Sequence, residues 1–115
     1  MTDVSTLDTI KQQIAEHAVI LYMKGNPQFP QCGFSARAVD ILTKYNKPFA
    51  FVNILDHPDI RSELPKYANW PTFPQLWIQG ELIGGSDIIM EMAQAGELEP
   101  MVIKATDNAQ SESQA

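Results

Sequence analysis

The amino-acid sequence predicts an α/β fold in which a four-stranded mixed sheet is flanked by helices. Two observations support this prediction. Short apolar stretches of strand length alternate with amphipathic stretches of helical length, and the last two expected strands are separated only by Gln79 and Gly80. A strand–helix–strand order implies parallel neighbours, whereas a two-residue connection is typical of an antiparallel hairpin. Together these patterns give a sheet with strands in both directions.

The first half of the chain predicts two helices and two strands. A helix is expected over residues 5–17, where apolar residues recur three and four positions apart, and the apolar run 18–23 predicts a central strand covered on both faces. A loop containing glycine and prolines leads into a helix over residues 34–45. Pro48 ends this helix, and residues 49–54 form the second strand. The buried stripe of the second helix is expected to consist of Ala38, Val39, Ile41, Leu42 and Tyr45.

The second half predicts a short helix and then a hairpin. Asp56 is the expected N-cap of the short helix, with Pro58 in its first turn. Residues 70–74, which contain two prolines, form a rigid loop before the third strand. That strand spans residues 75–78, and the fourth spans residues 81–83.

The C-terminal part predicts a closing helix and a tail. The helix is expected over residues 88–95 with Gly96 just past its end, and one or two helical turns follow Leu98. Residues 1–105 are expected to form the only domain. Residues 106–115, rich in Ser, Gln, Ala and acidic residues, are expected to be a disordered polar tail.

Composition narrows the classes of partner. The net charge of −6 argues against nucleic acid, since phosphate binding requires a basic surface. No apolar run approaches the ~18 residues that span a bilayer. The first residues show no basic segment followed by an apolar one, so we expect no secretion signal, no membrane partner and a cytoplasmic protein.

Cys32 is the only cysteine, and it falls at the start of the second helix. Backbone N–H groups at a helix N-terminus stabilise a thiolate, which is the nucleophilic and metal-binding form of the side chain. A single thiol cannot form an intramolecular disulfide, so redox or metal chemistry at Cys32 requires sulfur from another molecule. The alternative is that Cys32 is a small buried apolar residue.

Four short strings occur in an order and spacing that resemble a known family. They are Tyr22-Met23-Lys24-Gly25, Cys32-Gly33-Phe34-Ser35, Trp70-Pro71-Thr72-Phe73-Pro74-Gln75 and Gly84-Gly85-Ser86-Asp87. The chain is similar to the monothiol glutaredoxins of the Cys-Gly-Phe-Ser type, in their short single-domain bacterial form. The resemblance covers about residues 4–105. It implies a thioredoxin-like fold and makes residues 1–105 a glutaredoxin domain.

Two serines stand where a second thiol could have been. In a dithiol motif the second cysteine resolves a mixed disulfide, and Ser35 occupies that position here. Many monothiol relatives have a cysteine in the Gly-Gly-Cys-Asp string, and this chain has Ser86 instead. Disulfide chemistry therefore needs an external thiol, for which the resemblance suggests glutathione.

The resemblance assigns roles to charged residues near the thiol. Lys24 would lower the pKa of the thiol and meet a carboxylate of glutathione, and Arg61 would bind the glycine carboxylate with both arms of its guanidinium. The alternative is that both are solvated charges, which is the interpretation kept for Lys66. Phe34 and Trp70 are candidate exposed aromatic residues beside the thiol. The expected catalytic and metal-binding residue is Cys32, and the expected glutathione-binding residues are Lys24, Cys32, Arg61, Phe73, Pro74, Ser86 and Asp87.

The two remaining strings concern the backbone. The resemblance implies that the Phe73–Pro74 bond is cis, which would turn the backbone of Phe73 toward a peptide ligand; a trans turn proline is the alternative and is favoured by base rates. Ser86 and Asp87 at a helix start would offer N–H groups to a carboxylate and a partner for an α-ammonium group. The same residue types also suit an ordinary N-cap.

A [2Fe–2S] cluster is typically held by four thiolates, and this chain supplies one. Two chains and two glutathiones supply four, so the count and the resemblance together predict a cluster-loaded homodimer and a monomeric apo form. The leading hypothesis is a carrier that transfers the cluster to apo-proteins in iron–sulfur cluster biogenesis. The alternative is a glutathione-dependent oxidoreductase acting on protein–glutathione mixed disulfides. Pairing with a BolA-like protein rests on the resemblance alone.

Overall fold

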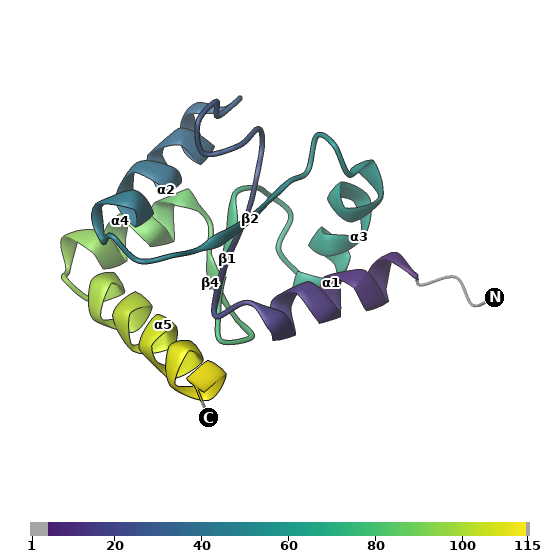
Figure 1. The fold of residues 1–115 in the computed structure, drawn as a ribbon. Helices are drawn as coiled ribbons and strands as arrows, with labels where there is room; N and C mark the ends of the chain where they lie inside the picture. The colour runs from purple at the N-terminus through teal and green to yellow at the C-terminus, as the bar shows by residue number, and fades with distance from the viewer. Residues whose placement is uncertain (1–4, 115) are drawn as a thin grey trace.

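Four strands form one mixed sheet in the order β2-β1-β3-β4 in the computed structural model, which describes residues 5–114 (Figure 1). The strands are β1 (Val19–Met23), β2 (Ala50–Asn53), β3 (Gln75–Ile78) and β4 (Glu81–Gly84). Strand β1 is parallel to β2 and antiparallel to β3, and β3 is antiparallel to β4. The predicted mixed sheet with a C-terminal hairpin is confirmed.

Helices cover both faces of this sheet, as predicted (Figure 1). They are α1 (Thr6–Glu16), α2 (Gly33–Lys44), α3 (Pro58–Ala68), α4 (Ser86–Gln94) and α5 (Leu98–Gln114). One apolar cluster joins α2, α4 and α5 to one face of the sheet, and a second joins α1 and α3 to the other. Over the residues that the structure describes, none of the helices combines the length and the apolar character needed to cross a membrane.

Strand β1 is apolar throughout because it contributes to both cores. Val19, Leu21 and Met23 lie in the cluster under α2, α4 and α5, whereas Ile20 and Tyr22 lie in the cluster under α1 and α3. All five side chains are buried. A strand buried on both faces has no solvated side and therefore shows a continuous apolar run rather than alternation.

The topology brings three segments together at one edge of the sheet. Met23 and Asn53 are register partners at the ends of the parallel strands β1 and β2, so the chain leaves both strands at the same edge. Gln75, the first residue of β3, pairs with Tyr22 near the end of β1 because these two strands are antiparallel. The segments 24–32 and 70–74 therefore meet at this edge.

Helix α3 differs at its start from the sequence prediction. Its N-cap is His57 rather than Asp56, with Pro58 as the first helical residue. The carboxylate of Asp56 instead accepts a hydrogen bond from the side chain of Asn53, three residues earlier, at 3.2 Å. Gly96 lies just past α4 with φ of 74°, which confirms its predicted role at the helix end.

The C-terminal segment also differs from the expected polar tail. Helix α5 continues through Gln114, and Thr106 is buried with its hydroxyl donating to the carbonyl of Val102 at 3.0 Å. Asp107 pairs with Lys47 at 3.5 Å. Leu98, Val102 and Ala105 pack into the core. These three residues precede the expected tail, and within residues 106–109 only Thr106 is buried, so the helix continues past the stripe that packs on the sheet. Residue 115 lies outside the described residues.

Candidate functional site

Cys32 is the N-cap residue of α2, in extended conformation with φ of −152° and ψ of 137°. This confirms the predicted position of the thiol at the start of a helix. The side chain is partly exposed and forms no disulfide. Its sulfur is therefore accessible to another molecule and lies where the positive end of the α2 dipole acts on it.

The surroundings of Cys32 lower its thiol pKa. The largest cause is the backbone N–H of Ser35, and the N–H of Phe34, the charge of Lys24 and the Ser35 hydroxyl act in the same direction. Partial burial opposes them by penalising the charged form. The net effect favours the thiolate, which is the form that attacks disulfides and binds iron.

Ser35, the residue in the resolving position of a dithiol motif, is completely buried. Its hydroxyl accepts a hydrogen bond from the backbone N–H of Lys24 at 3.1 Å. The same hydroxyl contributes to the lowered pKa of Cys32. Ser35 therefore joins the end of β1 to the start of α2, so that Lys24 and Cys32 are held on either side of one side chain.

The loop between Lys24 and Cys32 is fixed by hydrogen bonds at both ends. The N–H of Gly25 donates to the side-chain oxygen of Asn53 at 2.9 Å, and the N–H of Gln31 donates to the carbonyl of Lys24 at 2.9 Å. Gly25 has φ of 91°, and a Cβ there would stand 2.5 Å from the Phe29 carbonyl oxygen. Only glycine fits this position. The closed loop leaves Phe29 72% exposed.

A pocket of about 240 Å³ lies between the 70–74 loop and the start of α4. It is lined by Phe34, Trp70, Thr72, Phe73, Pro74, Gly85, Ser86, Asp87 and Ile88. Four of the expected glutathione-binding residues are therefore brought together. The Phe73–Pro74 bond is cis, as predicted. Of the two aromatic residues expected to be exposed, Phe34 is 59% exposed and Trp70 is partly buried.

The start of α4 differs in detail from the alternative of a serine cap. Gly85 is the N-cap and has no side chain to offer, while Ser86 is the first helical residue and is buried. A Cβ at Gly85 would come within 3.4 Å of both the Pro74 carbonyl and the Trp70 indole nitrogen, so the glycine lets the two pocket walls approach. That indole N–H is buried and has no hydrogen-bond partner among the described residues.

The remaining sequence-predicted residues lie apart from this pocket. Arg61 is exposed on α3, which starts at the same sheet edge as α2, and it does not line the pocket. Lys66 pairs with Glu63 on its own helix at 3.7 Å, in agreement with its interpretation as a solvated charge. Lys24 and Cys32 also lie outside the pocket lining.

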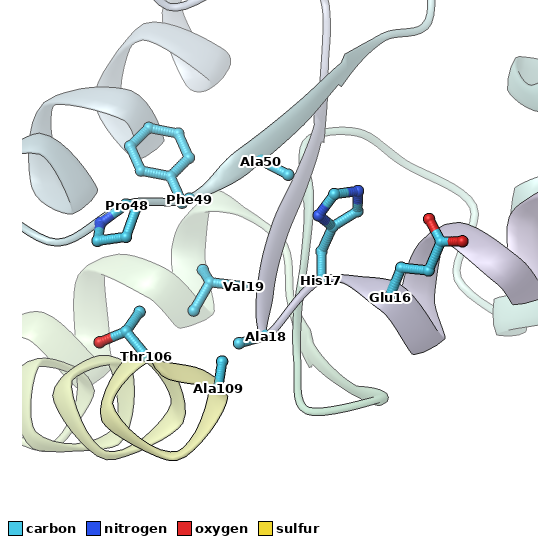
Figure 2. A pocket seen from close by; sticks show the side chains of 9 residues that line it. All are labelled: Glu16, His17, Ala18, Val19, Pro48, Phe49, Ala50, Thr106 and Ala109. Atoms are coloured by element: carbon cyan, nitrogen blue, oxygen red, sulfur yellow. The ribbon is translucent and has the colours of Figure 1, made fainter. Parts of the chain in front are cut away.

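A larger hollow of about 380 Å³ lies at the other end of β1 (Figure 2). Figure 2 shows Val19 of β1 between Phe49 and Thr106 of α5, with Ala18 close to Ala109. It contains none of the expected site residues. The described residues contain no group of three or more His, Cys, Asp or Glu side chains placed to hold a metal ion.

Sequence reasoning missed two residues that shape the site. Asn53 accepts the Gly25 N–H, and the Gln75 side chain donates to the carbonyl of Trp70 at 3.0 Å. Gln75 is completely buried in a strand that is otherwise apolar. A polar residue next to a buried apolar run is the signal that could have identified it, because a buried amide must find partners.

Comparison with known proteins places this arrangement in a class. A two-core mixed sheet with a thiol at the start of the first crossover helix and a cis proline before β3 defines a thioredoxin-like fold. The family described as Glutaredoxin matches residues 19–83, and the chain belongs to the glutaredoxin family. Because Cys32 is its only cysteine, it is of the monothiol type.

Individual relatives cover most of the chain. Glutaredoxin 4 of Pasteurella multocida is 64% identical over 97 residues, which are 84% of this chain and 89% of that protein. Glutaredoxin 4 of Escherichia coli K12 is 56% identical over 108 residues, 94% of each chain. The solution structure of reduced poplar apo GrxS14 is 49% identical, with a TM-score of 0.73 over 84% of this chain and 89% of that one.

Proposed function

We propose that this chain carries a [2Fe–2S] cluster between two copies of itself, with glutathione completing the ligand set, and delivers the cluster to apo-proteins. The observation that carries the proposal is a single, partly exposed thiol with a lowered pKa near a pocket that contains no second thiol. One thiolate cannot hold a cluster that typically needs four. Two chains and two glutathiones supply them.

Glutathione fits the residues around the thiol by its charges. The uncapped start of α4 offers backbone N–H groups to a carboxylate, and Asp87 in its first turn offers a partner to the α-ammonium group. Lys24 and Arg61 are cations at the same edge of the sheet, suited to the glycine carboxylate. The tripeptide backbone would lie along Phe73 and the cis proline, with its sulfur toward Cys32.

Cluster transfer is favoured by ligands that leave easily. Glutathione is not covalently attached to the chain, so half of the proposed ligands can exchange with those of an acceptor. We further propose that the apo form is a monomer, that the protein acts in the cytoplasm, and that a BolA-like protein is a second partner. Membership of the monothiol glutaredoxins supports these assignments.

The second candidate function is thiol exchange, which the lowered pKa of Cys32 favours. The Cys32 thiolate would attack the glutathione sulfur of a protein–glutathione disulfide and release the protein thiolate. A second glutathione thiolate would then attack the Cys32–glutathione disulfide, restoring the Cys32 thiolate and releasing oxidised glutathione. Ser35 and Ser86 cannot resolve that intermediate within the chain, so each cycle needs external thiol.

Anaerobic reconstitution with iron and sulfide, with and without glutathione, tests the proposal. We expect a coloured dimer on gel filtration only when glutathione is present, with one cluster per two chains. The Cys32→Ser variant should stay colourless and monomeric. A wild-type protein that remains colourless and monomeric under both conditions would overturn the carrier function and favour thiol exchange.

A further inference from the structure

The Gln75 side chain makes three hydrogen bonds inside the protein. Its Nε2 donates to the carbonyl of Trp70 at 3.0 Å and to the carbonyl of Thr72 at 3.3 Å. Its Oε1 accepts from the Trp77 indole N–H at 3.2 Å. The residue has no exposed surface. Both N–H groups of the amide are therefore used, and its carbonyl has a partner.

This arrangement fixes the orientation of the amide. Turning the amide over would place Oε1 against two backbone carbonyls and Nε2 against the Trp77 N–H, so all three contacts would become repulsive. Trp77, which donates to the amide oxygen of Gln75, is itself fixed, because its ring stacks on Tyr67 of α3 with centroids 6.1 Å apart. Gln75 thus connects a packed strand to the loop before it.

That loop is one wall of the candidate pocket. Trp70, Thr72, Phe73 and Pro74 all line it, opposite the start of α4. No backbone–backbone bond outside regular helices and strands fixes Thr72 or Phe73 among the described residues, whereas the Trp70 N–H is tied to the Pro65 carbonyl at 3.1 Å. The bonds from Gln75 are the ones that reach into the middle of the wall.

An apolar side chain would suit a strand buried on all sides. The other β3 residues, Leu76, Trp77 and Ile78, are buried and pack in the two cores. Burying an amide costs desolvation that its hydrogen bonds only offset. The fully buried glutamine at the start of β3 is therefore explained by its hydrogen bonds to the 70–74 loop rather than by the stability of the core.

We propose that Gln75 is a positioning residue for glutathione: its amide sets the 70–74 loop in the conformation that binds the tripeptide. The proposal rests on the function proposed above. In this proposal the apolar residues of β3 stabilise the fold, and Gln75 positions the 70–74 loop that lines the pocket. It predicts that removing the amide affects ligand binding beyond its effect on folding.

The test compares Gln75→Met with Trp77→Phe. The methionine has a similar shape and removes both bonds to the loop. The phenylalanine keeps the stacked ring and removes only the bond on the other side of the amide. In anaerobic calorimetry of the reduced proteins with reduced glutathione, we expect the dissociation constant to rise about tenfold for Gln75→Met and to change less than about twofold for Trp77→Phe. Gln75→Glu, which keeps an acceptor for the Trp77 N–H and loses both N–H donors to the loop, serves if the methionine variant fails to fold.

A second measurement does not depend on glutathione. Backbone ¹⁵N order parameters at Thr72 and Phe73 should fall from about 0.85 to below about 0.6 in Gln75→Met and stay high in Trp77→Phe. A Gln75→Met protein that is less stable but keeps wild-type affinity and a rigid loop would overturn the proposal, as would equal loss in both variants. If the wild type binds no glutathione, the proposed function fails, and the order parameters alone decide whether Gln75 positions the loop.

Discussion

The buried Ser35 hydroxyl accepts a hydrogen bond from Lys24 and contributes to the lowered pKa of Cys32, and Ser35→Ala removes both effects. The change leaves the Lys24 N–H without its acceptor, which is 3.1 Å away in the native chain. Losing the partner of a partly buried donor costs about 1–2 kcal/mol, and the better helix propensity of alanine returns about 0.5 kcal/mol. We therefore expect the free energy of unfolding to fall by about 1 kcal/mol, which lowers the melting temperature by about 4 °C in a domain of this size.

The same variant should raise the thiol pKa only slightly. The Ser35 hydroxyl is the smallest of the contributions that lower it, and the backbone N–H groups of Ser35 and Phe34 remain in place. Lys24→Gln removes a larger contribution and should raise the thiol pKa more, with little change in stability because the Lys24 side chain forms no ion pair among the described residues. Ser35→Ala should thus lower the free energy of unfolding more than Lys24→Gln does, and it should raise the thiol pKa of Cys32 less.

Urea denaturation and the pH dependence of alkylation by iodoacetamide measure these two effects. Ser62→Ala is the matched control, since Ser62 is an exposed serine inside a helix and should gain slightly in stability. If Ser35→Ala matched Ser62→Ala in unfolding free energy, the hydrogen bond to Lys24 would contribute nothing. If it raised the thiol pKa more than Lys24→Gln, the order of contributions at Cys32 would be wrong.

Three further predictions concern the loop, the thiol and the cations. Gly25→Ala should lower the denaturation midpoint more than Gly80→Ala, because both sites have positive φ but only at Gly25 would the new Cβ meet backbone atoms, the nearest at 2.5 Å; equal losses would show that the loop yields freely. Because the Cys32 pKa is lowered in the folded state, its contribution to stability is present above the unfolded-state pKa and is lost as pH falls through the folded one. The stability of the wild type relative to Cys32→Ser should therefore rise with pH across that window, and a flat difference would contradict the lowered pKa. Arg61→Met should weaken glutathione binding about tenfold while Lys66→Met leaves it unchanged, as measured by calorimetry, and equal effects would remove Arg61 from the site.

The sequence was sufficient where structure depends on local pattern. The cis proline before β3, which the family resemblance implied, is confirmed. The apolar run of β1 predicted a strand between two cores and the position of Cys32 predicted a helix start, and both are confirmed. Each depends on residues close together in the chain. The resemblance to glutaredoxins was confirmed by a match across residues 19–83.

The parts that were missed depend on which partner a polar side chain finds in the folded chain. Asn53 holds Gly25 across 28 positions of sequence, and no local pattern predicts that pairing. Asp56 had the right residue type for an N-cap, but its carboxylate accepts from the side chain of Asn53 three residues earlier, and residue type alone does not decide between these two local roles. Helix α5 has a polar composition and becomes ordered through a stripe ending near Thr106 that is visible only against the folded sheet. The hydrogen bonds of polar side chains, both local and distant, are thus the main source of error.

The central claim is the ligand set of the cluster, and native mass spectrometry of the reconstituted protein tests it most directly. The ligand set proposed above predicts that the cluster-loaded species contains two chains, two irons, two sulfides and two glutathiones, because each chain has a single thiol. Removing glutathione by buffer exchange should release the cluster and return the monomer. A cluster bound by one chain, or by two chains without glutathione, would contradict the account.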